Sequence, residues 1–227
     1  RMDSTTQHDT HRFFLSQTAH ISCGRLQQRT ADSLYFIKVD SLAIEASTHT
    51  LTAFNLAYSP RFSKRDFQKK ITYRNDRFDL AIPKVVMKNM DWWALFNRQV
   101  LACDVADTYN GYLRDFVNDS LPSNPTIKIT NFPYQMVRKL SLALNIKKIN
   151  IHHFQLSYEE YLPASGQSGT LYFDNINAQL RNIITIPAYI HPGMRCSLAA
   201  TALAMPTIPT RIGFSFVMAH SKTGSFS

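Results

Sequence analysis

Residues 145 to 186 alternate between apolar and polar side chains, and this alternation constrains the fold more than any other feature of the chain. Apolar residues occupy every second position in short runs, as expected for β-strands that bury one face. The runs contain Ile149 and Ile151, then Phe154, Leu156 and Tyr158, then Leu171 and Phe173, and then Ile176, Ala178 and Leu180. A segment rich in Pro, Gly and Ser separates the second run from the third and predicts a turn.

The phase of the alternation changes twice within this segment. Apolar positions move from odd to even numbers across His152 and His153, and they shift again across Asp174 and Asn175. Successive side chains of a strand point to opposite faces, so a slip of one residue would invert the apolar set. We therefore expect bulges, kinks or breaks at both places, and a bent sheet with one apolar face.

Shorter runs of the same kind occur through most of the chain and predict an antiparallel meander. Polar turns separate the runs, and Pro60 ends the first series. Within each run, the apolar residues are all at odd or all at even positions and would share one face of a strand. The runs are Leu15, Ala19, Ile21 and Cys23; Tyr35, Ile37 and Val39; Leu42, Ile44 and Ala46; Phe54, Leu56 and Tyr58; Phe78, Leu80 and Ile82; Leu101, Cys103 and Val105; Leu203 and Met205; and Ile212, Phe214, Phe216 and Met218.

Three short helices are predicted among these strands. Ser63 can cap a helix through residue 70 that turns Phe67 inward, and Asp91 can cap one over residues 91–97. The third covers residues 132–141, with apolar residues at helical spacing. Trp92 and Trp93 lie in the second helix, where they either anchor it on the sheet or offer rings to a stacking ligand.

The chain divides at a polar, Pro-containing hinge, LPSNPTIKIT. Residues 1–125 form a β-rich segment with the helices near 63–70 and 91–97. Residues 126–227 form the helix at 132–141 and a β-meander. We expect both to belong to one continuous unit of a mainly β protein, with a curved antiparallel sheet carrying short packed helices, and we interpret the chain, which begins with Arg1, as a piece of a longer protein.

The composition excludes several classes of function. The chain carries 25 Lys and Arg against 16 Asp and Glu, a formal charge of +9 that favours anionic partners. Its densest basic run, Lys64 to Arg77, is interpreted as a solvated face, and no nucleic-acid-binding signature accompanies it, so no nucleic-acid partner is expected. The three cysteines lack metal or disulfide spacing and are interpreted as small buried residues. No apolar run is long enough for a membrane-spanning helix.

No catalytic centre, cofactor site or metal site can be assembled from the sequence. Phosphate-binding glycine loops are absent. Glu159 and Glu160 are adjacent, as are His152 and His153, so on a strand each pair points to opposite faces. The chain is therefore predicted not to be an enzyme, with no catalytic residues, no metal ligands and no cofactor.

Several segments together resemble the AsmA-like family, which includes TamB-like and related bridge-like lipid-transport proteins of the bacterial envelope. The segments carrying the resemblance lie mostly between residues 33 and 186. They are YSPRFSKRDF, DRFDLAIPKVVMKNMDWWALF, FPYQMVRKL, IKKINIHHFQLSYEEY and GTLYFDNINAQLRNI, with a vaguer similarity in RIGFSFVMAHSKTGSFS. The segment AMPTIPT departs from the family pattern, which has a Gly-containing turn there.

The resemblance implies a long curved sheet that forms an open groove, apolar inside and polar outside, in which lipid tails lie. It implies a periplasmic protein that supports outer-membrane lipid homeostasis, anchored to the inner membrane by a segment outside this chain, with envelope proteins as partners through its sheet edges. The predicted lipid-binding residues are Ile149, Ile151, Phe154, Leu156, Tyr158, Leu171, Phe173 and Ile176. Two alternatives stay open. These residues could form a closed core under the helix at 133–141, or the chain could be a structural module that pairs with other proteins through an exposed sheet edge.

Overall fold

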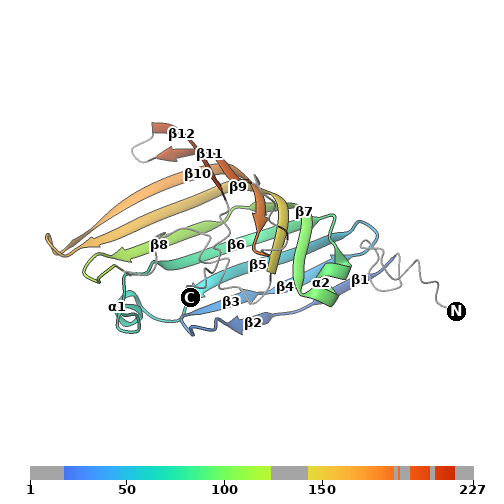
Figure 1. Ribbon diagram of the computed structural model, residues 1–227, viewed down its shortest axis with the longest axis horizontal. Helices are drawn as coiled ribbons and strands as arrows, with labels where there is room; N and C mark the ends of the chain where they lie inside the picture. The colour runs from blue at the N-terminus through green and yellow to red at the C-terminus, as the bar shows by residue number, and fades with distance from the viewer. Residues whose placement is uncertain (1–17, 124–142, 187–188, 190–194, 205–207, 218–227) are drawn as a thin grey trace, which may run out of the picture.

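A computed structural model describes residues 18–123, 143–186, 189, 195–204 and 208–217. These residues form one mixed sheet with two helices on it (Figure 1). The strands are β1 (His20–Cys23), β2 (Leu26–Arg29), β3 (Tyr35–Val39), β4 (Ser41–Glu45), β5 (Thr50–Pro60), β6 (Arg77–Lys88), β7 (Val100–Tyr109), β8 (Tyr112–Asn118), β9 (Ala143–Leu162), β10 (Gln167–Ile184), β11 (Arg195–Ala204) and β12 (Ile208–Val217). The predicted mainly β fold is confirmed.

The strand order along the sheet is β1-β4-β5-β6-β7-β9-β10-β11-β12, with β3 beside β5, β2 beside β3, and β8 between β6 and β9. Most neighbours are antiparallel, as predicted. The exceptions are β7 and β8, which both run parallel to β9. They pair with successive parts of β9, so together they behave as one long strand interrupted at Asn110 and Gly111. Strands from both predicted segments therefore lie in one sheet.

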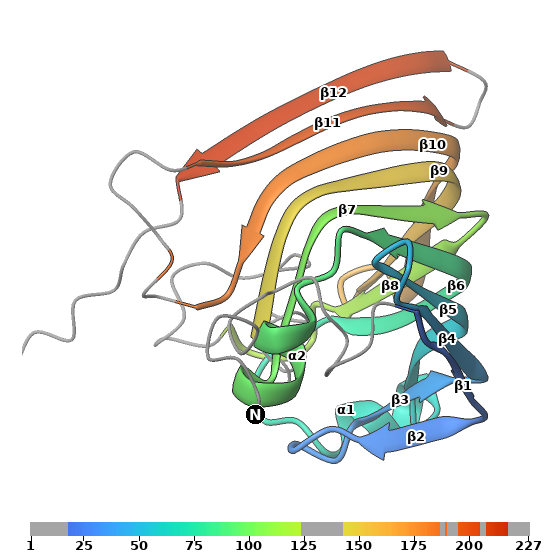
Figure 2. The ribbon, with the colours of Figure 1, turned by 90° about the vertical axis from the view of Figure 1, so that its right-hand side faces the viewer.

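Both phase slips predicted in the long strands are confirmed as irregularities of β9 and β10. His153 and Asn175 have positive φ angles of 55° and 47°. The pairing register between the two strands shifts between Phe173 and Ile176 and again between Ile176 and Ala178. Figure 2 shows both strands bending strongly along their length. The His153 ring contacts the Asn175 side chain, with 2.8 Å between Nδ1 and Oδ1.

These two residues belong to a line of irregular positions that crosses the sheet. Asn55 of β5 and Asn110 after β7 also have positive φ, and both lie level with His153 in the strand registers. Pro83 of β6 lies between them. Asn tolerates the left-handed conformation better than most residues, and Pro is accepted within sheets at bulges. We call Asn55, Pro83, Asn110, His153 and Asn175 the bulge line.

A second set of irregular positions lies nearer the start of β9. Asn89 and Asn182 have positive φ. Between them in the sheet, Lys147 Nζ lies 2.7 Å from Asp104 Oδ1, and Asn89 Nδ2 donates to Asp104 Oδ2 at 3.1 Å. The long strands thus change phase twice, and both changes are shared by neighbouring strands.

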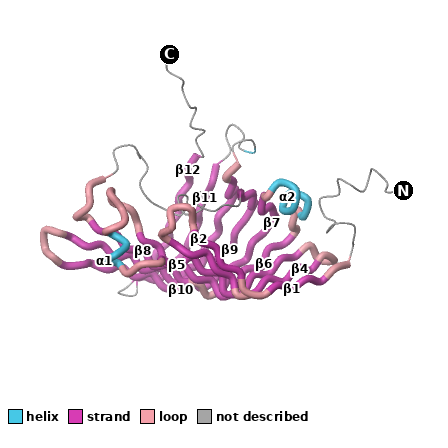
Figure 3. The backbone as a smooth tube through the Cα atoms, turned by 90° about the horizontal axis from the view of Figure 1, so that it is seen from below, coloured by secondary structure: helices cyan, strands magenta, loops and turns pink. Residues whose placement is uncertain are grey.

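Both described helices were predicted, with their caps. Helix α1 (Lys64–Gln68) begins after Ser63, whose Oγ accepts a hydrogen bond from the Asp66 backbone N–H. Helix α2 (Trp92–Arg98) begins after Asp91, whose Oδ1 accepts a hydrogen bond from the Ala94 backbone N–H at 2.8 Å. Figure 3 shows the helices at opposite ends of the sheet and on the same side of it. The predicted helix at 132–141 and most of the predicted hinge lie outside the described residues.

One grouping of the sequence analysis is wrong because of the bulge line. Phe54 shares its parity with Leu56 and Tyr58, but Asn55 between them adopts a left-handed conformation. Leu56 and Tyr58 pack in hydrophobic clusters, whereas Phe54 is exposed. A left-handed residue reverses the face of the side chains that follow it, and strict alternation cannot detect this.

Candidate functional site

All eight predicted lipid-binding residues lie on one face of β9 and β10. Across the two strands, Phe154 pairs with Ile176, Leu156 with Phe173, and Tyr158 with Leu171. Ile149 and Ile151 precede the bulge and pack in clusters on the same face. The bulge at His153 keeps the two halves in phase. Both α1 and α2 pack on this face through Phe67 and Trp92, so we call it the helix-bearing face.

At the α2 end, the helix-bearing face is closed by protein. Trp92 is fully buried among residues of β5, β7, β9 and β10. Ile149 and Leu180 pack against this cluster, whose buried members are Ala46, Leu51, Met90, Trp92, Cys103, Ala106, Leu144, Ile146 and Ile183. Trp93 is less buried, and its ring lies under the Arg98 guanidinium at 4.4 Å. The structure thus gives both Trp rings protein contacts.

The middle of the helix-bearing face is centred on Phe154. This ring packs with Ala53, Ile82 and Val85 of β5 and β6. It lies directly over Gly111, where an added Cβ would come within 2.2 Å of the ring. Glycine is therefore needed at 111 for the phenyl ring to reach the neighbouring strands.

Beneath α1, the face is lined with stacked aromatic rings. Tyr35 and Tyr58 stack with centroids 4.3 Å apart, and Phe67 of α1 meets Tyr35 edge-on at 5.6 Å. The Tyr35 hydroxyl donates to the Asp76 carbonyl at 3.1 Å. Burial raises the pKa of both tyrosines above the usual range, so both remain neutral.

Two buried carboxyl groups, which the sequence pattern did not predict, lie beside this aromatic cluster. Asp115 of β8 pairs with Phe78 on one side and with Tyr158 on the other, so its side chain is on the helix-bearing face. Asp115 is 6% exposed and Asp76 is 3% exposed. Burial, and then the nearby Asp76, raise the pKa of Asp115 to about 7. Leu113 and Asp115 are two positions apart on one strand, and this spacing was the available signal that they share a face. The apolar residues Phe116 and Val117, which follow directly, break the alternation and hid this signal.

At the hairpin end, where β9 turns into β10, the face opens to solvent. Leu171 is 58% exposed although it pairs with Tyr158, and Leu156 and Phe173 are half-buried. Burial, and then the charge of Glu160, raise the pKa of Tyr158 to about 12. The eight predicted residues therefore form a continuous apolar stripe that is covered at one end and exposed at the other.

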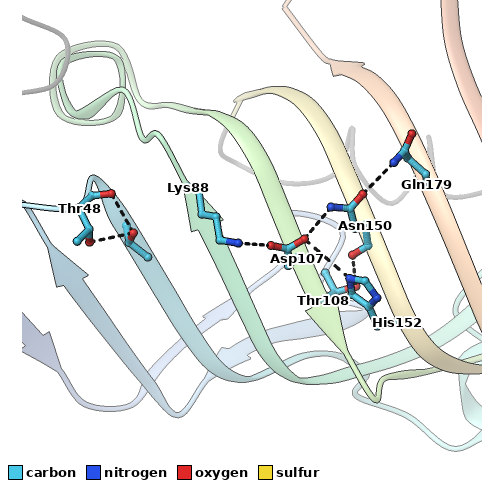
Figure 4. A network of polar contacts seen from close by, with 8 residues as sticks. Thr48, Lys88, Asp107, Thr108, Asn150, His152 and Gln179 are labelled. Carbon is cyan, nitrogen blue, oxygen red and sulfur yellow. Dashed lines mark hydrogen bonds and ion pairs between the residues drawn. The ribbon is translucent and has the colours of Figure 1, made fainter.

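The opposite face of the sheet carries a polar network across four strands (Figure 4). Asp107 accepts hydrogen bonds from Lys88 Nζ at 2.8 Å and from Asn150 Nδ2 at 2.7 Å. Asn150 Oδ1 accepts one from Gln179 Nε2 at 3.1 Å. Burial acts to raise the pKa of Asp107, but the hydrogen bonds from Lys88 and Asn150 outweigh it and the pKa is lowered. The network ties the parallel β7–β9 pair to its neighbours.

The remaining polar candidates have structural partners. His152 stacks on Tyr109 with centroids 4.9 Å apart, and the side chain of His153 contacts Asn175. In the basic run, Lys64 pairs with Glu159, Arg74 with Asp119, and Arg77 donates to the Phe62 carbonyl at 2.9 Å. Lys64, Arg65, Lys69 and Lys70 are exposed, as the predicted solvated face requires, whereas Arg74 and Arg77 are half-buried and held by the protein.

The cysteines differ from the prediction at one position. Cys103 and Cys196 are buried as expected, and burial raises the pKa of Cys103 to about 12. Cys23 is exposed, because the short edge strand β1 has both faces open.

Within the part of the chain that the structure describes, no group of three or more His, Cys, Asp or Glu side chains is arranged to hold a metal ion. Among the same residues, no helix has the length and apolar character needed to span a bilayer. A scan against protein-family models finds no match for this chain, and a search of curated proteins finds none either.

Proposed function

We propose that this chain is a non-enzymatic segment of a bacterial envelope protein that holds or conducts phospholipid, or a similar amphiphile, along the helix-bearing face. The observation that carries the proposal is the continuous apolar stripe on β9 and β10, with Leu171 58% exposed at its hairpin end. The resemblance of IKKINIHHFQLSYEEY and GTLYFDNINAQLRNI to AsmA-like proteins supports the same function.

The energetics of such binding require no catalytic group and no polar motif. Each buried CH₂ group contributes roughly 0.8 kcal/mol, so an acyl chain lying over half its length along the stripe gains several kcal/mol. The two faces of β9 and β10 also differ in polarity, as expected of a sheet that is apolar inside and polar outside. The polar network of Asp107 and Asn150 lies on the face away from the stripe. The net charge of +9 would favour anionic headgroups at the rim, where each nearby cation adds about 1 kcal/mol at a membrane surface.

The proposal is tested by measuring lipid that co-purifies with the chain, using native mass spectrometry after gentle purification. Leu156→Glu places a charge in the stripe, and Ser157→Glu places the same charge on the other face of the same strand. Both residues are half-buried, so they make a matched pair. We expect Leu156→Glu to lose the lipid and Ser157→Glu to retain it, with circular dichroism confirming that both variants fold. A wild-type chain that is repeatedly free of lipid would overturn the proposal.

A second candidate function is a structural or interaction module that pairs through its sheet edges. Within the described residues, β12 pairs only with β11 and β1 only with β4. Exposed edges of this kind accept a further strand through backbone hydrogen bonds. Sedimentation of the purified chain over a wide concentration range tests self-pairing. Oligomers that grow with concentration would support edge pairing, and a monomer throughout would count against it.

A further inference from the structure

Five side chains at the α1 end of the sheet alternate between cations and aromatic rings. Lys38 Nζ lies 5.3 Å from the centre of the Phe36 ring, and the Arg61 guanidinium carbon lies 5.1 Å from the same point. Arg61 also lies 5.2 Å from the centre of the Phe62 ring, which Lys70 Nζ approaches to 4.7 Å. We call these five residues the cation–aromatic cluster. It joins β3, the chain that follows β5 and the chain that follows α1.

The three cations of the cluster form no ion pair with a carboxylate among the described residues. The acidic residues that flank them in sequence are engaged elsewhere. Asp40 lies 3.5 Å from Arg25, Asp66 lies 2.9 Å from Lys69, and Asp32 accepts hydrogen bonds within its own turn. Aromatic rings attract cations but carry no net charge, so the three positive charges are not neutralised.

The cluster orders its charged groups before any ligand binds. Arg61 Nη1 donates to the Ser33 carbonyl at 2.6 Å, and Lys38 and Arg61 are half-buried beside their rings. Ordering long side chains is part of the entropic cost of binding, and folding has already imposed part of it here. The other N–H groups of Arg61 and both ammonium groups have no hydrogen-bond partner among the described residues, so they can donate to an anion.

A phosphate group suits this arrangement. Its oxygens accept charge-assisted hydrogen bonds from a guanidinium and from ammonium groups, and such bonds are stronger than neutral ones. Single-stranded nucleic acid also carries phosphates, but it binds with its bases stacked on free aromatic faces. Phe36 and Phe62 are half-buried and have cations against their rings, so they are a poor platform for bases.

The cluster lies at the end of the sheet where the apolar stripe is exposed. Lys64, the first residue of α1, pairs with Glu159, which follows Tyr158 of the stripe. Figure 1 shows α1 at the end of the sheet toward which the β9–β10 hairpin points. We propose that the cation–aromatic cluster binds the phosphate of an anionic phospholipid headgroup at a membrane surface. The inference rests on the proposed function for its purpose, because it would bring the exposed end of the stripe to a membrane.

The test is cosedimentation of the full chain with phosphatidylcholine vesicles that contain or lack phosphatidylglycerol. Lys38→Gln/Arg61→Gln/Lys70→Gln removes the cations of the cluster. Lys84→Gln/Lys148→Gln/Arg181→Gln is the matched control, since it also removes two lysines and one arginine that have no ion pair among the described residues.

We expect the wild type and the control to bind vesicles that contain phosphatidylglycerol. The cluster variant should lose about tenfold or more in affinity, because each cation near an anionic surface contributes roughly fivefold. A wild type that does not bind these vesicles would overturn the proposal. Equal losses in the two variants would also overturn it, because the net charge of +9 would then explain binding.

A single substitution keeps the test available if circular dichroism shows that the triple variant does not fold. Lys70 is exposed and lies beyond the end of α1, so Lys70→Gln leaves the packing of the sheet intact. It should lose about fivefold in affinity for vesicles with phosphatidylglycerol, and Lys84→Gln should lose less. Equal affinities of these two single variants would contradict the proposal.

Competition distinguishes a lipid headgroup from other phosphates. Inorganic phosphate should displace the chain from the vesicles more strongly than sodium chloride at the same ionic strength. Equal displacement would show that screening alone governs binding and would overturn the proposal. Inorganic phosphate that binds the wild type but not the cluster variant, without vesicle binding, would overturn the lipid assignment in favour of a soluble phosphate. Tighter binding of a single-stranded oligonucleotide that the cluster variant loses would overturn it in favour of nucleic acid.

The outcome separates this inference from the proposed function. If the stripe holds lipid but the cluster does not bind headgroups, the wild-type chain retains co-purified lipid and fails to sediment with the vesicles. If the cluster binds headgroups but the stripe is a closed core, the chain sediments with the vesicles and carries no co-purified lipid. Leu156→Glu, which disrupts the stripe alone, should sediment like the wild type.

Discussion

The two ends of the helix-bearing face share the same strands and the same alternation but differ in what covers them. At the α2 end, Trp92 is fully buried over Ala106 and Ile146. At the hairpin end, Leu171 stays 58% exposed beside Tyr158. The difference has two sources: α2, a helix of seven residues, covers the first end, and β11 stops pairing with β10 at Phe173, before Leu171. An alternating strand therefore determines which residues share a face, while the helices and the lengths of the neighbouring strands determine which part of that face is closed.

The largest expected effect distinguishes the closed end from the open one. Trp92→Ala should lower the free energy of unfolding by about 3–5 kcal/mol, because it empties a fully buried site. Leu171→Ala should change it by less than about 0.5 kcal/mol, because the side chain is mostly in water. Urea denaturation of both variants measures the difference. Similar losses at the two positions would mean that the hairpin end is as closed as the α2 end.

The next effect concerns the buried acid near the hairpin end. The pKa of Asp115 in the folded chain is about 7, against an ordinary value of 3.8. The folded state therefore binds more protons than the unfolded state between these values, so stability falls as pH rises from 3.8 to about 7 and stays lower above that. Asp115→Asn should remove this dependence of stability on pH and should stabilise the chain above pH 7. The gain is roughly 4 kcal/mol at most, because each unit by which the pKa of Asp115 is raised corresponds to about 1.4 kcal/mol.

The measurement for Asp115 is the free energy of unfolding between pH 4 and pH 8. Asp104→Asn provides the control from the α2 end of the sheet, because the Asp104 carboxylate is half-exposed and pairs with Lys147 at 2.7 Å. This variant should keep the slope and lose less than about 1 kcal/mol. An unchanged slope in Asp115→Asn would contradict the raised pKa.

The middle of the face gives a smaller effect. Gly111→Ala should cost about 1–3 kcal/mol, because the added Cβ would meet the Phe154 ring at 2.2 Å and force it to move. The double variant Gly111→Ala/Phe154→Leu should lose less than the sum of the two single losses, since the smaller side chain gives room to the methyl group. Additive losses in thermal or urea denaturation would show that the two positions do not meet.

The sequence predicted most of the candidate site but not its surroundings. Alternation placed Phe154, Leu156 and Tyr158 on one face, and the phase slips located bulges at His153 and Asn175. It could not reveal that Asn55 and Asn110 continue this line, because those irregularities become aligned only after the strands pair.

The parallel pairing of β7 and β8 with β9 was missed for the same physical reason. Runs in residues 100–118 and 143–162 alternate alike whether their strands run parallel or antiparallel, so the pattern does not fix the direction. Asp115 was missed because burial of a carboxyl group depends on the neighbouring strands that cover it. In this chain those neighbours are Phe78 and Tyr158.

The smallest expected effect tests the bulge that keeps the two ends of the face in phase. Asn175 has a φ angle of 47°, which a β-branched residue adopts at a cost of about 1–2 kcal/mol. Asn175→Val should therefore be less stable than Asn175→Gly by about 1 kcal/mol, although both variants lose the contact with His153. Hydrogen exchange of residues 171–180 adds a structural readout, because a bulge that moves would re-pair this part of β10. If valine is tolerated as well as glycine, the bulge at Asn175 is not what keeps Leu171 and Leu180 on the same face.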